Sequence, residues 1–242
     1  MSSSPFELKA VDKMKVYDSI VEQILAGIRS EAFPPGSVLP PERELAAQLG
    51  VSRGSVREAI RVLEHAGVLD VRTGSGTYVA AGGASKTFAL RAHAAVLGEE
   101  SPLDVIIARR AIEPVSAQYA ALNRHPRDLI ALKDSVSEQG RLVKLGEDPS
   151  APDLFFHIAL AEASRNPVLR LLFERIAEIM QQGTWQALKH RSRDRPGRQE
   201  MYLEEHDVIL KEIQKQDAVA AARAMQQHLD SVEEGLLAEV EE

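Results

Sequence analysis

The run Ala80-Ala81-Gly82-Gly83-Ala84-Ser85 constrains this chain more than any other feature, because the sequence pattern differs on its two sides. Small, flexible residues in a row are typical of a linker between domains. The 242 residues suffice for two domains of modest size. We therefore expect a first domain at residues 1–80, a linker at residues 81–87 and a second domain at residues 88–242.

The first eighty residues carry the pattern helix, helix, helix, hairpin. Apolar residues recur every four positions from Val16 to Ile28, which marks one face of a helix. Gly50 is a helix stop and Ser52 a helix N-cap, so they separate a second helix from a third. The expected elements are helices at about 16–28, 41–49 and 52–66, then strands at 68–71 and 77–79 around a turn at 72–76.

After the linker the chain shows helical patterns and no β-rich stretch. Several antiparallel helices of this length form a bundle. The sequence thus predicts a mainly α fold, with a small β-hairpin in the first domain and an antiparallel all-α bundle in the second. The expected helices cover residues 86–97, 102–123, 127–145, 151–164, 167–188, 198–215 and 217–240.

The tight turn Gly50-Val51-Ser52 joins the second and third helices, as in a helix-turn-helix. The second helix of such a pair lies in the major groove of DNA, and its first residues reach base edges. Here these residues include Arg53 and Arg57, and arginine can donate two hydrogen bonds to guanine. On spacing alone, a packed three-helix unit with solvated arginines stays open as the alternative.

Residues 1–80 are close to neutral, with 9 Lys and Arg against 10 Asp and Glu, while the whole chain has a net charge of −7. A DNA-binding face must therefore come from where the arginines lie rather than from net charge. Arg43, early in the second helix, is placed to meet phosphate. The turn Thr73-Gly74-Ser75-Gly76 is placed to enter the neighbouring minor groove.

Asp153 and His157 lie four residues apart in one expected helix, so their side chains share a face. His206 and His228 lie on two later helices, and three imidazoles with one carboxylate inside a bundle can bind a divalent metal. Without a thiolate the ligand set does not select a soft ion, so zinc, nickel and manganese all fit. Structural roles stay open: helix capping for Asp153, and solvated or core positions for the histidines.

The absence of cysteine excludes a disulfide scaffold, an iron–sulfur cluster, a cysteine-rich zinc finger and a thiol nucleophile. No apolar run approaches the ~18 residues that a membrane-spanning helix needs. The segment from Met1 to Lys15 lacks the apolar core of a secretory signal. We expect a cytoplasmic protein with no membrane partner.

The motifs of the first domain strongly resemble the winged helix-turn-helix of GntR-family transcription regulators, over roughly residues 13–80. The segments that carry the resemblance are Leu39–Ala46, Gly50–Ala59, Leu63–Leu69 and Gly74–Val79. It implies binding to double-stranded operator DNA. By this resemblance the DNA-contacting positions are Arg43, Arg53, Gly54, Ser55 and Arg57, with Thr73 and Gly74 at the tip of the wing.

The second domain resembles the all-helical FCD ligand-binding domain of the FadR subfamily. The motifs that carry this resemblance are Arg109–Pro114, Asp153–His157, Glu162–Leu169, Glu205-His206 and Met225–Leu229. Metal-binding members use one Asp and three His and bind small carboxylates beside the metal. The resemblance therefore implies a metal set of Asp153, His157, His206 and His228, with Arg109 and Asn166 as effector-binding residues.

These features predict a transcription regulator, a repressor whose operator affinity is controlled by a hydroxy acid or sugar acid bound beside a divalent metal. Zinc is the first choice of metal. The resemblance implies a homodimer, and a dimer reads an imperfect palindrome. We expect no enzyme activity. The alternative is a helical-bundle metalloenzyme acting on a small carboxylate, because a metal with an open position can activate water.

Overall fold

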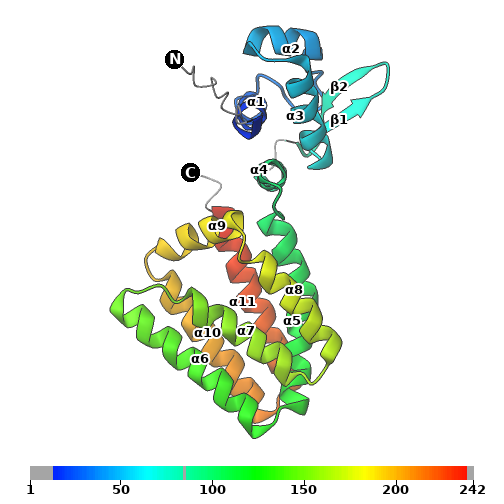
Figure 1. Ribbon diagram of the computed structural model, residues 1–242. Helices are drawn as coiled ribbons and strands as arrows, with labels where there is room; N and C mark the ends of the chain where they lie inside the picture. The colour runs from blue at the N-terminus through cyan, green and yellow to red at the C-terminus, as the bar shows by residue number, and fades with distance from the viewer. Residues whose placement is uncertain (1–12, 84–85, 239–242) are drawn as a thin grey trace, which may run out of the picture. The chain divides into compact units, whose positions relative to one another are not determined.

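The structure is a computed structural model that describes residues 13–83 and 86–238 (Figure 1). It divides into two compact units between Gly98 and Glu99. The division comes later in the chain than the linker predicted at residues 81–87, because helix α4 (Lys86–Leu97) packs on the first unit, where Ala92 and Val96 join the core. Residues 84–85 of that linker and 239–240 of the last expected helix lie outside the described residues.

The first unit contains the expected helices and hairpin. Its elements are α1 (Lys13–Arg29), α2 (Glu42–Leu49), α3 (Arg53–His65), β1 (Leu69–Arg72) and β2 (Gly76–Val79), followed by α4. The antiparallel strands pair from Leu69 opposite Val79 to Arg72 opposite Gly76. Apolar side chains of α1, α3 and the hairpin form the core that holds these elements together.

Local signals explain the turn between α2 and α3. Gly50 ends α2 in the left-handed conformation at φ +66°, which favours glycine. Ser52 caps α3, since its hydroxyl accepts a hydrogen bond from the Ser55 N–H at 3.1 Å. The buried stripe of α3 then starts at Val56, which leaves the side of α3 that carries Arg53 and Arg57 exposed.

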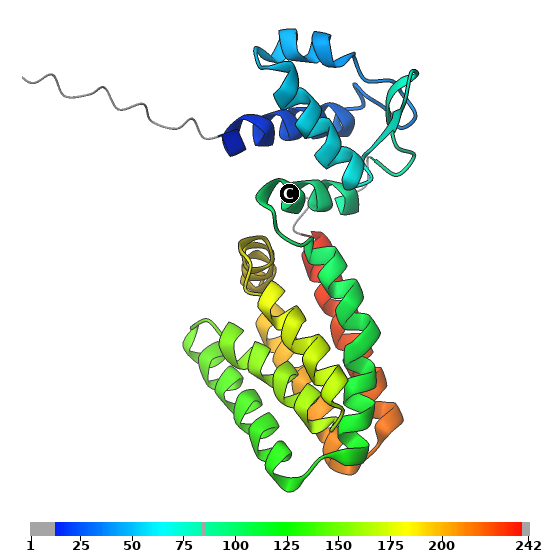
Figure 2. The same cartoon turned by 45° about the vertical axis from the view of Figure 1, so that its right-hand side comes forward.

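The second unit is a bundle of helices (Figures 1 and 2). Its elements are α5 (Pro102–Asn123), α6 (Pro126–Leu145), α7 (Ser150–Ala163), α8 (Pro167–Ile179), α9 (Gly183–Asp194), α10 (Arg198–Lys215) and α11 (Ala218–Ala238). Helix α5 packs along α11 and also contacts α7, α8 and α10, while α6 packs on α7 and α10. No helix of the described residues is long and apolar enough to cross a membrane.

The prediction of a single helix at residues 167–188 is wrong, because the chain forms two helices there. α8 ends at Ile179 and α9 starts at Gly183, after Gln182 adopts an extended conformation. Gln182 makes no side-chain cap for α9. The Glu99 carboxylate instead accepts hydrogen bonds from the N–H groups of Gly183 at 3.2 Å and Thr184 at 2.6 Å. A cap supplied from so far along the chain leaves no local sequence signal.

Candidate functional sites

The candidate DNA interface consists of exposed residues on α2, α3 and the hairpin turn. Arg43, Arg53 and Gly54 are exposed, and Ser55 is half-buried. Neither Arg43 nor Arg53 has an ion-pair partner among the described residues. The predicted positions therefore lie on the solvent side of the helix-turn-helix, where their donors are available to nucleic acid.

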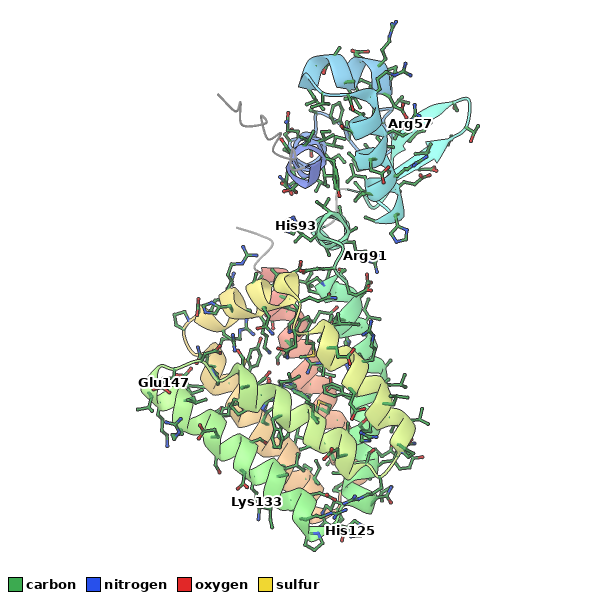
Figure 3. All side chains as sticks on the ribbon, viewed as in Figure 1. Arg57, Arg91, His93, His125, Lys133 and Glu147 are labelled. Carbon is green, nitrogen blue, oxygen red and sulfur yellow. The ribbon has the colours of Figure 1, made fainter. Side chains whose placement is uncertain are left out.

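Arg57 differs from the other predicted contacts, because its guanidinium is already engaged. It lies on the exposed side of α3 (Figure 3), where its Nε donates to both carboxylate oxygens of Glu42 at 3.2 Å. Its Nη2 donates to Glu42 Oε2 at 2.9 Å. This hydrogen bonding lowers the pKa of Glu42, and the pair ties α2 to α3. Any other acceptor that binds Arg57 must therefore displace Glu42.

The hairpin turn carries the predicted wing tip. Thr73 and Gly74 are exposed, and Gly74 has φ +76°, a conformation that favours glycine. Behind the tip, the Arg72 guanidinium stacks on the Tyr78 ring at 4.3 Å and its Nε donates to Asp70 at 2.9 Å. The Arg72–Tyr78 contact joins the two strands, and neither contact involves the exposed residues Thr73 and Gly74 at the tip.

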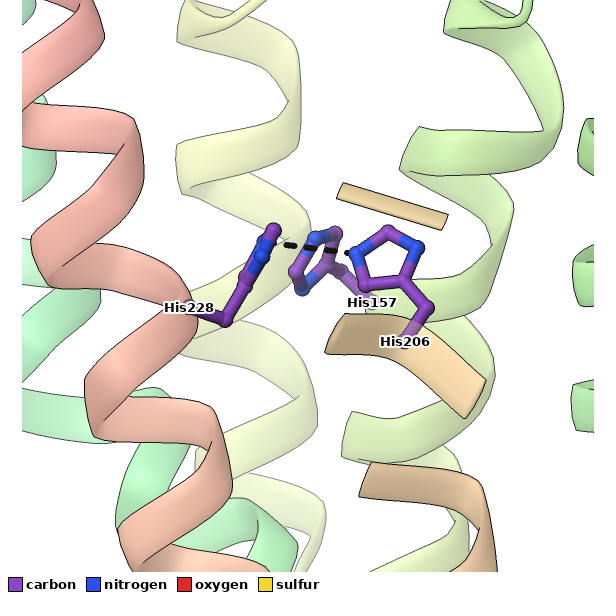
Figure 4. Close-up of side chains that lie close together, drawn as sticks. All are labelled: His157, His206 and His228. Carbon is purple, nitrogen blue, oxygen red and sulfur yellow. Dashed lines mark hydrogen bonds between the residues drawn. The ribbon is translucent and has the colours of Figure 1, made fainter. Parts of the chain in front are cut away.

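The candidate metal centre is a cluster of three buried histidines from three helices of the second unit (Figure 4). His157 lies on α7, His206 on α10 and His228 on α11, and one ring nitrogen from each lies within 4.8 Å of the others. The two Nε2 atoms of His206 and His228 are 3.2 Å apart. The structure thus brings together the three histidines predicted from the sequence.

An oxygen acceptor binds the outer nitrogen of His206 and of His228, and a Glu113 carboxylate oxygen lies beside Nδ1 of His157. His157 Nδ1 lies 2.5 Å from Glu113, His206 Nδ1 lies 2.8 Å from the Gln139 amide oxygen, and His228 Nδ1 lies 2.8 Å from Glu205. Because the Gln139 and Glu205 oxygens accept, the protons of His206 and His228 belong on Nδ1 and their lone pairs on Nε2, inside the cluster. Such outer acceptors orient metal-binding histidines, so the donor set fits a divalent ion.

The charge states also suit a metal. Burial lowers the pKa of His206 and of His228 well below the usual range, and the neighbouring imidazoles lower it further. Burial raises the pKa of Asp153, but Lys189 and the imidazoles outweigh it and hold that pKa well below its usual value. Neutral imidazoles with an ionised carboxylate are the protonation states that bind a cation.

Asp153 lies at the edge of the histidine cluster. Its Oδ1 is 3.9 Å from His206 Nε2, and its side chain is buried. It lies one turn before His157 on α7, as its spacing predicts. Asp153 also lines a neighbouring cavity, so it connects the cluster to that cavity.

Arg109, predicted to bind an effector, is fully buried on α5. Its Nε donates to Glu113 Oε1 at 2.5 Å, and its Nη2 lies 3.1 Å from His157 Nε2. Burial raises the pKa of Glu113, but Arg109 and His157 outweigh burial and hold it at about 2. Arg109 does not line the cavity beside Asp153, although its guanidinium carbon lies 5.6 Å from the ring centroid of Trp185, which does.

Asn166, the second predicted effector residue, is a helix cap. Its side-chain oxygen accepts from the N–H groups of Val168 at 3.0 Å and Leu169 at 3.3 Å, at the start of α8. It lines a separate cleft that contains neither Asp153 nor any of the three histidines. The structure therefore does not bring Asn166 together with the histidine cluster.

A cavity of about 410 Å³ lies between α7 and α9, next to Asp153. Trp185, Lys189 and Arg193 line it from α9. Lys189 is 4% exposed, and its Nζ has no hydrogen-bond partner among the described residues. Burial lowers the pKa of Lys189 to about 8, against the opposing effect of Asp153. Lys189 Nζ lies 4.3 Å from the centroid of the Tyr202 ring, a cation–π contact that provides no hydrogen-bond acceptor. A buried ammonium without an acceptor suits an anionic ligand, because a buried charge that lacks hydrogen bonds is costly.

Lys189 and Arg193 are the site residues that the sequence reasoning missed. Trp185, Lys189 and Arg193 recur every four residues, so they share one face of α9. A lysine and an arginine on the same helix face as a tryptophan indicate that this face is at least partly buried. That signal was available, but the helix expected at residues 167–188 ended before Lys189.

Sequence comparisons match both units. The pattern of the bacterial regulatory proteins of the gntR family matches residues 16–79, and the pattern of the FCD domain matches residues 104–231. A Uxu operon regulator of Haemophilus influenzae is 32% identical over 218 residues, covering 90% of this chain and 80% of the relative. The Exu regulon transcriptional regulator of Escherichia coli K12 is 30% identical over 225 residues, covering 93% and 85%.

Solved structures share the fold. A GntR family member from Pseudomonas syringae pv. tomato aligns with a TM-score of 0.54 and 20% identity, covering 96% of this chain and 89% of that one. E. coli McbR/YncC aligns with a TM-score of 0.50 and 19% identity, covering 96% and 99%. At these identities the likeness shows the fold alone.

Proposed function

Because the chain belongs to the gntR family of bacterial regulatory proteins and carries an FCD domain, we propose that it is a repressor controlled by a small carboxylate and a divalent metal. Transcription regulation and DNA binding are properties of the family. The chain is therefore a regulator and not an enzyme, and the metalloenzyme alternative has no support. One observation carries the effector part of the proposal, namely the buried Lys189, whose Nζ has no hydrogen-bond acceptor among the described residues and lines the cavity beside Asp153.

Asp153, His157, His206 and His228 would hold the metal. The inward lone pairs of His206 and His228 support this assignment, as do the acceptors on their outer nitrogens. The set contains nitrogen and oxygen donors only, so zinc is the first choice and nickel and manganese are alternatives. When bound, the metal would supply an electrophilic position to which a carboxylate or hydroxyl of the effector coordinates.

The cavity between α7 and α9 is the proposed effector site. Lys189 gives an effector carboxylate its charge partner, and Trp185 supplies an apolar wall. Arg109 and Asn166 stay proposed effector residues. Arg109 contacts two residues of the site, Trp185 and His157. The Uxu and Exu relatives are named as regulators of an operon and of a regulon. For this chain we propose a hydroxy acid or sugar acid as the effector class.

We propose a homodimer that binds an imperfect palindrome, because two-fold symmetric dimers read two half-sites. An exposed apolar surface on α5 and α8, called the α5–α8 face below, supports this proposal. The two helices pack side by side in Figures 1 and 2. The face consists of Ile107, Val115, Tyr119 and Leu122 on α5 and Val168, Leu171 and Leu172 on α8.

The size and charge of the α5–α8 face favour a second copy of the chain as its occupant. The seven residues are about half exposed and together present roughly 700 Å² of surface, close to the ~800 Å² per partner of a standard interface. The charges beside it on α8 form balanced pairs, Arg170 with Glu174 and Arg175 with Glu178. A surface without net charge does not repel its own copy in a two-fold arrangement.

A regulator of this family acts on chromosomal DNA, so we propose that it works in the cytoplasm. In the proposed mechanism, Arg53 reads a base and Arg43 meets phosphate, while Thr73 and Gly74 enter the minor groove. Gly54 and Ser55 allow the α3 backbone to come close to DNA, and Arg57 exchanges Glu42 for DNA. Effector binding then weakens operator binding and relieves repression.

Two measurements test the proposal. The first is selection of bound fragments from genomic DNA by the zinc-loaded chain, which should enrich an imperfect palindrome. The second is Trp185 fluorescence during titration with L-lactate, a short hydroxy acid, or D-glucuronate, a sugar acid. The chain has one tryptophan, so the signal reports on the cavity. Lys189→Met should lose the response, and the exposed Lys211→Met should keep it. No enriched fragment from a folded, metal-loaded sample would contradict the proposal.

A further inference from the structure

Glu99 is the first residue of the second unit, and it caps a helix that lies far along the chain. Its Oε1 accepts from the Gly183 N–H at 3.2 Å and its Oε2 from the Thr184 N–H at 2.6 Å. In return, the side-chain oxygen of Gln182 accepts from the Glu100 N–H at 2.9 Å. These three hydrogen bonds, called the Glu99 cap below, join the start of the unit to the start of α9.

The Glu99 cap occupies N–H groups at the start of α9. The first N–H groups of a helix have no partner within the helix, and the N-cap residue Gln182 makes no side-chain cap bond here. A carboxylate at this end is also favoured by the helix dipole. Glu99 thus provides both the hydrogen bonds and the charge that this helix end requires.

The same helix forms one wall of the proposed effector cavity, through Trp185, Lys189 and Arg193. At the far end of α9, Arg193 Nη1 donates to Asp148 Oδ1 at 2.8 Å and to Ser150. Helix α9 is therefore tied to the cavity through Arg193 and to the junction between the units through Glu99. A helix transmits displacement along its axis, because its turns are hydrogen-bonded to one another.

We propose that the Glu99 cap transmits effector binding: an anion bound at Lys189 and Arg193 shifts α9, and α9 moves Glu99 and the chain that leads to the DNA-binding unit. This inference rests on the proposed function and specifies how effector binding reaches the DNA-binding unit. A ligand shifts an equilibrium only when it binds one arrangement better than the other. An anion gives Lys189 the acceptor that it lacks and competes with Asp148 for Arg193. Both effects change the contacts that fix α9.

Gly98 makes the junction suited to this role. It precedes Glu99, has φ +68° and has open space around its Cα, where a side chain would meet no atom within 4 Å. The left-handed conformation is one that glycine enters and leaves at little cost. A displacement of Glu99 can therefore change the backbone direction at Gly98 and so the direction of the chain that leads to the DNA-binding unit.

The test separates effector binding from its transmission. The zinc-loaded full chain is compared as wild type, Glu99→Ala, Glu99→Gln and Glu100→Ala. L-Lactate and D-glucuronate are the probes, and Trp185 fluorescence measures their affinity. The affinity for the selected operator fragment is then measured with and without saturating probe. Glu100→Ala is the matched control, because the Glu100 side chain is exposed and the Glu99 cap uses only its backbone N–H.

In wild type, the probe should change operator affinity by ~5–150-fold, the usual range of allosteric coupling. We expect Glu99→Ala to bind probe as wild type does but to lose this change. Glu99→Gln, which keeps one acceptor, should be intermediate, and Glu100→Ala should resemble wild type. A full response in Glu99→Ala would overturn the inference. So would a loss of probe binding in both Glu99 variants, since Glu99 would then support the cavity itself.

The wild-type arm distinguishes failure of this inference from failure of the proposed function. If wild type binds operator and neither probe changes its operator affinity, two claims are overturned. The Glu99 cap is then not a transmitter, and these acids do not control operator binding. A wild-type response that persists in Glu99→Ala overturns the inference alone. The proposed function then stands, with another route for the signal.

Discussion

At the scale of single residues, the histidine cluster depends on side chains that do not belong to it. Gln139 and Glu205 accept from the outer nitrogens of His206 and His228 and thereby fix which nitrogen faces inward, while the Glu113 carboxylate lies beside Nδ1 of His157. These three residues come from α5, α6 and α10. The orientation of the cluster is therefore a property of the packed bundle and not of any one helix.

Gln139→Ala should lower zinc affinity by ~10–100-fold, the usual cost of removing such an outer partner. Gln139 is buried and accepts from His206 Nδ1 at 2.8 Å, so its loss leaves the ring free to turn. Competition with a zinc chelator measures the affinity. Gln226→Ala on α11 serves as control, because the one side-chain hydrogen bond that Gln226 makes to a described residue is to Asp230. Equal affinities for the two variants would remove Gln139 from the site.

The buried Glu113 predicts how stability depends on pH. Its pKa is about 2 in the folded chain, against an ordinary value of 4.5. Because the folded-state pKa is depressed, Glu113 contributes stability above about pH 4.5, and this contribution disappears as the pH falls towards 2. The shift corresponds to a contribution on the order of 3 kcal/mol to the free energy of unfolding.

Urea unfolding at pH 6 and pH 3 measures this contribution in the metal-free chain. Wild type should lose more stability between the two pH values than Glu113→Gln, which cannot ionise. A parallel loss in both proteins would show that Glu113 is not responsible. Thermal unfolding at the same two pH values provides an independent check.

Sequence reasoning was most successful for site residues on regular helices. Asp153 and His157 share a face because of their spacing, and the structure places both among buried groups. The sequence did not indicate that Arg109 would be held by Glu113 and His157. That arrangement depends on how α5 packs against α7, which no local pattern encodes.

At the scale of elements, α3 carries the residues proposed to read DNA. Arg53→Ala should weaken operator binding by about 1–3 kcal/mol if Arg53 contacts a base edge. Arg29→Ala on α1 is the matched control, since Arg29 is exposed and pairs only loosely with Glu22 at 3.8 Å. Fluorescence anisotropy with the selected fragment measures both affinities at one fixed salt concentration. Equal binding by the two variants would exclude Arg53 as a reader.

Helix limits were predictable where local signals exist. The expected helices at 102–123 and 198–215 match α5 and α10, and proline or glycine marks their starts. The break between α8 and α9 was missed, because its decisive partner is Glu99. Helix α4 was expected, but its packing on the first unit depends on Ala92 and Val96 meeting that core. Contacts between distant segments thus account for the parts that the sequence did not predict.

At the scale of the whole molecule, the α5–α8 face should decide the oligomeric state. Val168→Glu places a carboxylate twice in the proposed two-fold interface, where an unpaired buried charge is strongly unfavourable. The dimer dissociation constant should rise by at least about tenfold, which is ~1.4 kcal/mol. Light scattering across a concentration series measures it.

Val219→Glu is the control for this change. Val168 and Val219 are both the second residue of their helices and are similarly exposed, at 62% and 67%. Val219 lies at the start of α11, outside the α5–α8 face. If Val168→Glu dimerises as tightly as Val219→Glu, the second copy binds elsewhere or the chain is a monomer.

The central claim is that a carboxylate at the metal centre controls operator binding, and one measurement tests it most directly. Operator affinity of the zinc-loaded chain is measured at fixed salt with and without L-lactate or D-glucuronate, for wild type and His206→Ala. We predict weaker operator binding by wild type with one of these acids. His206→Ala should bind operator as tightly as acid-free wild type and respond to neither acid. The claim would be contradicted if neither acid changed the operator affinity of wild type, or if His206→Ala showed the full change.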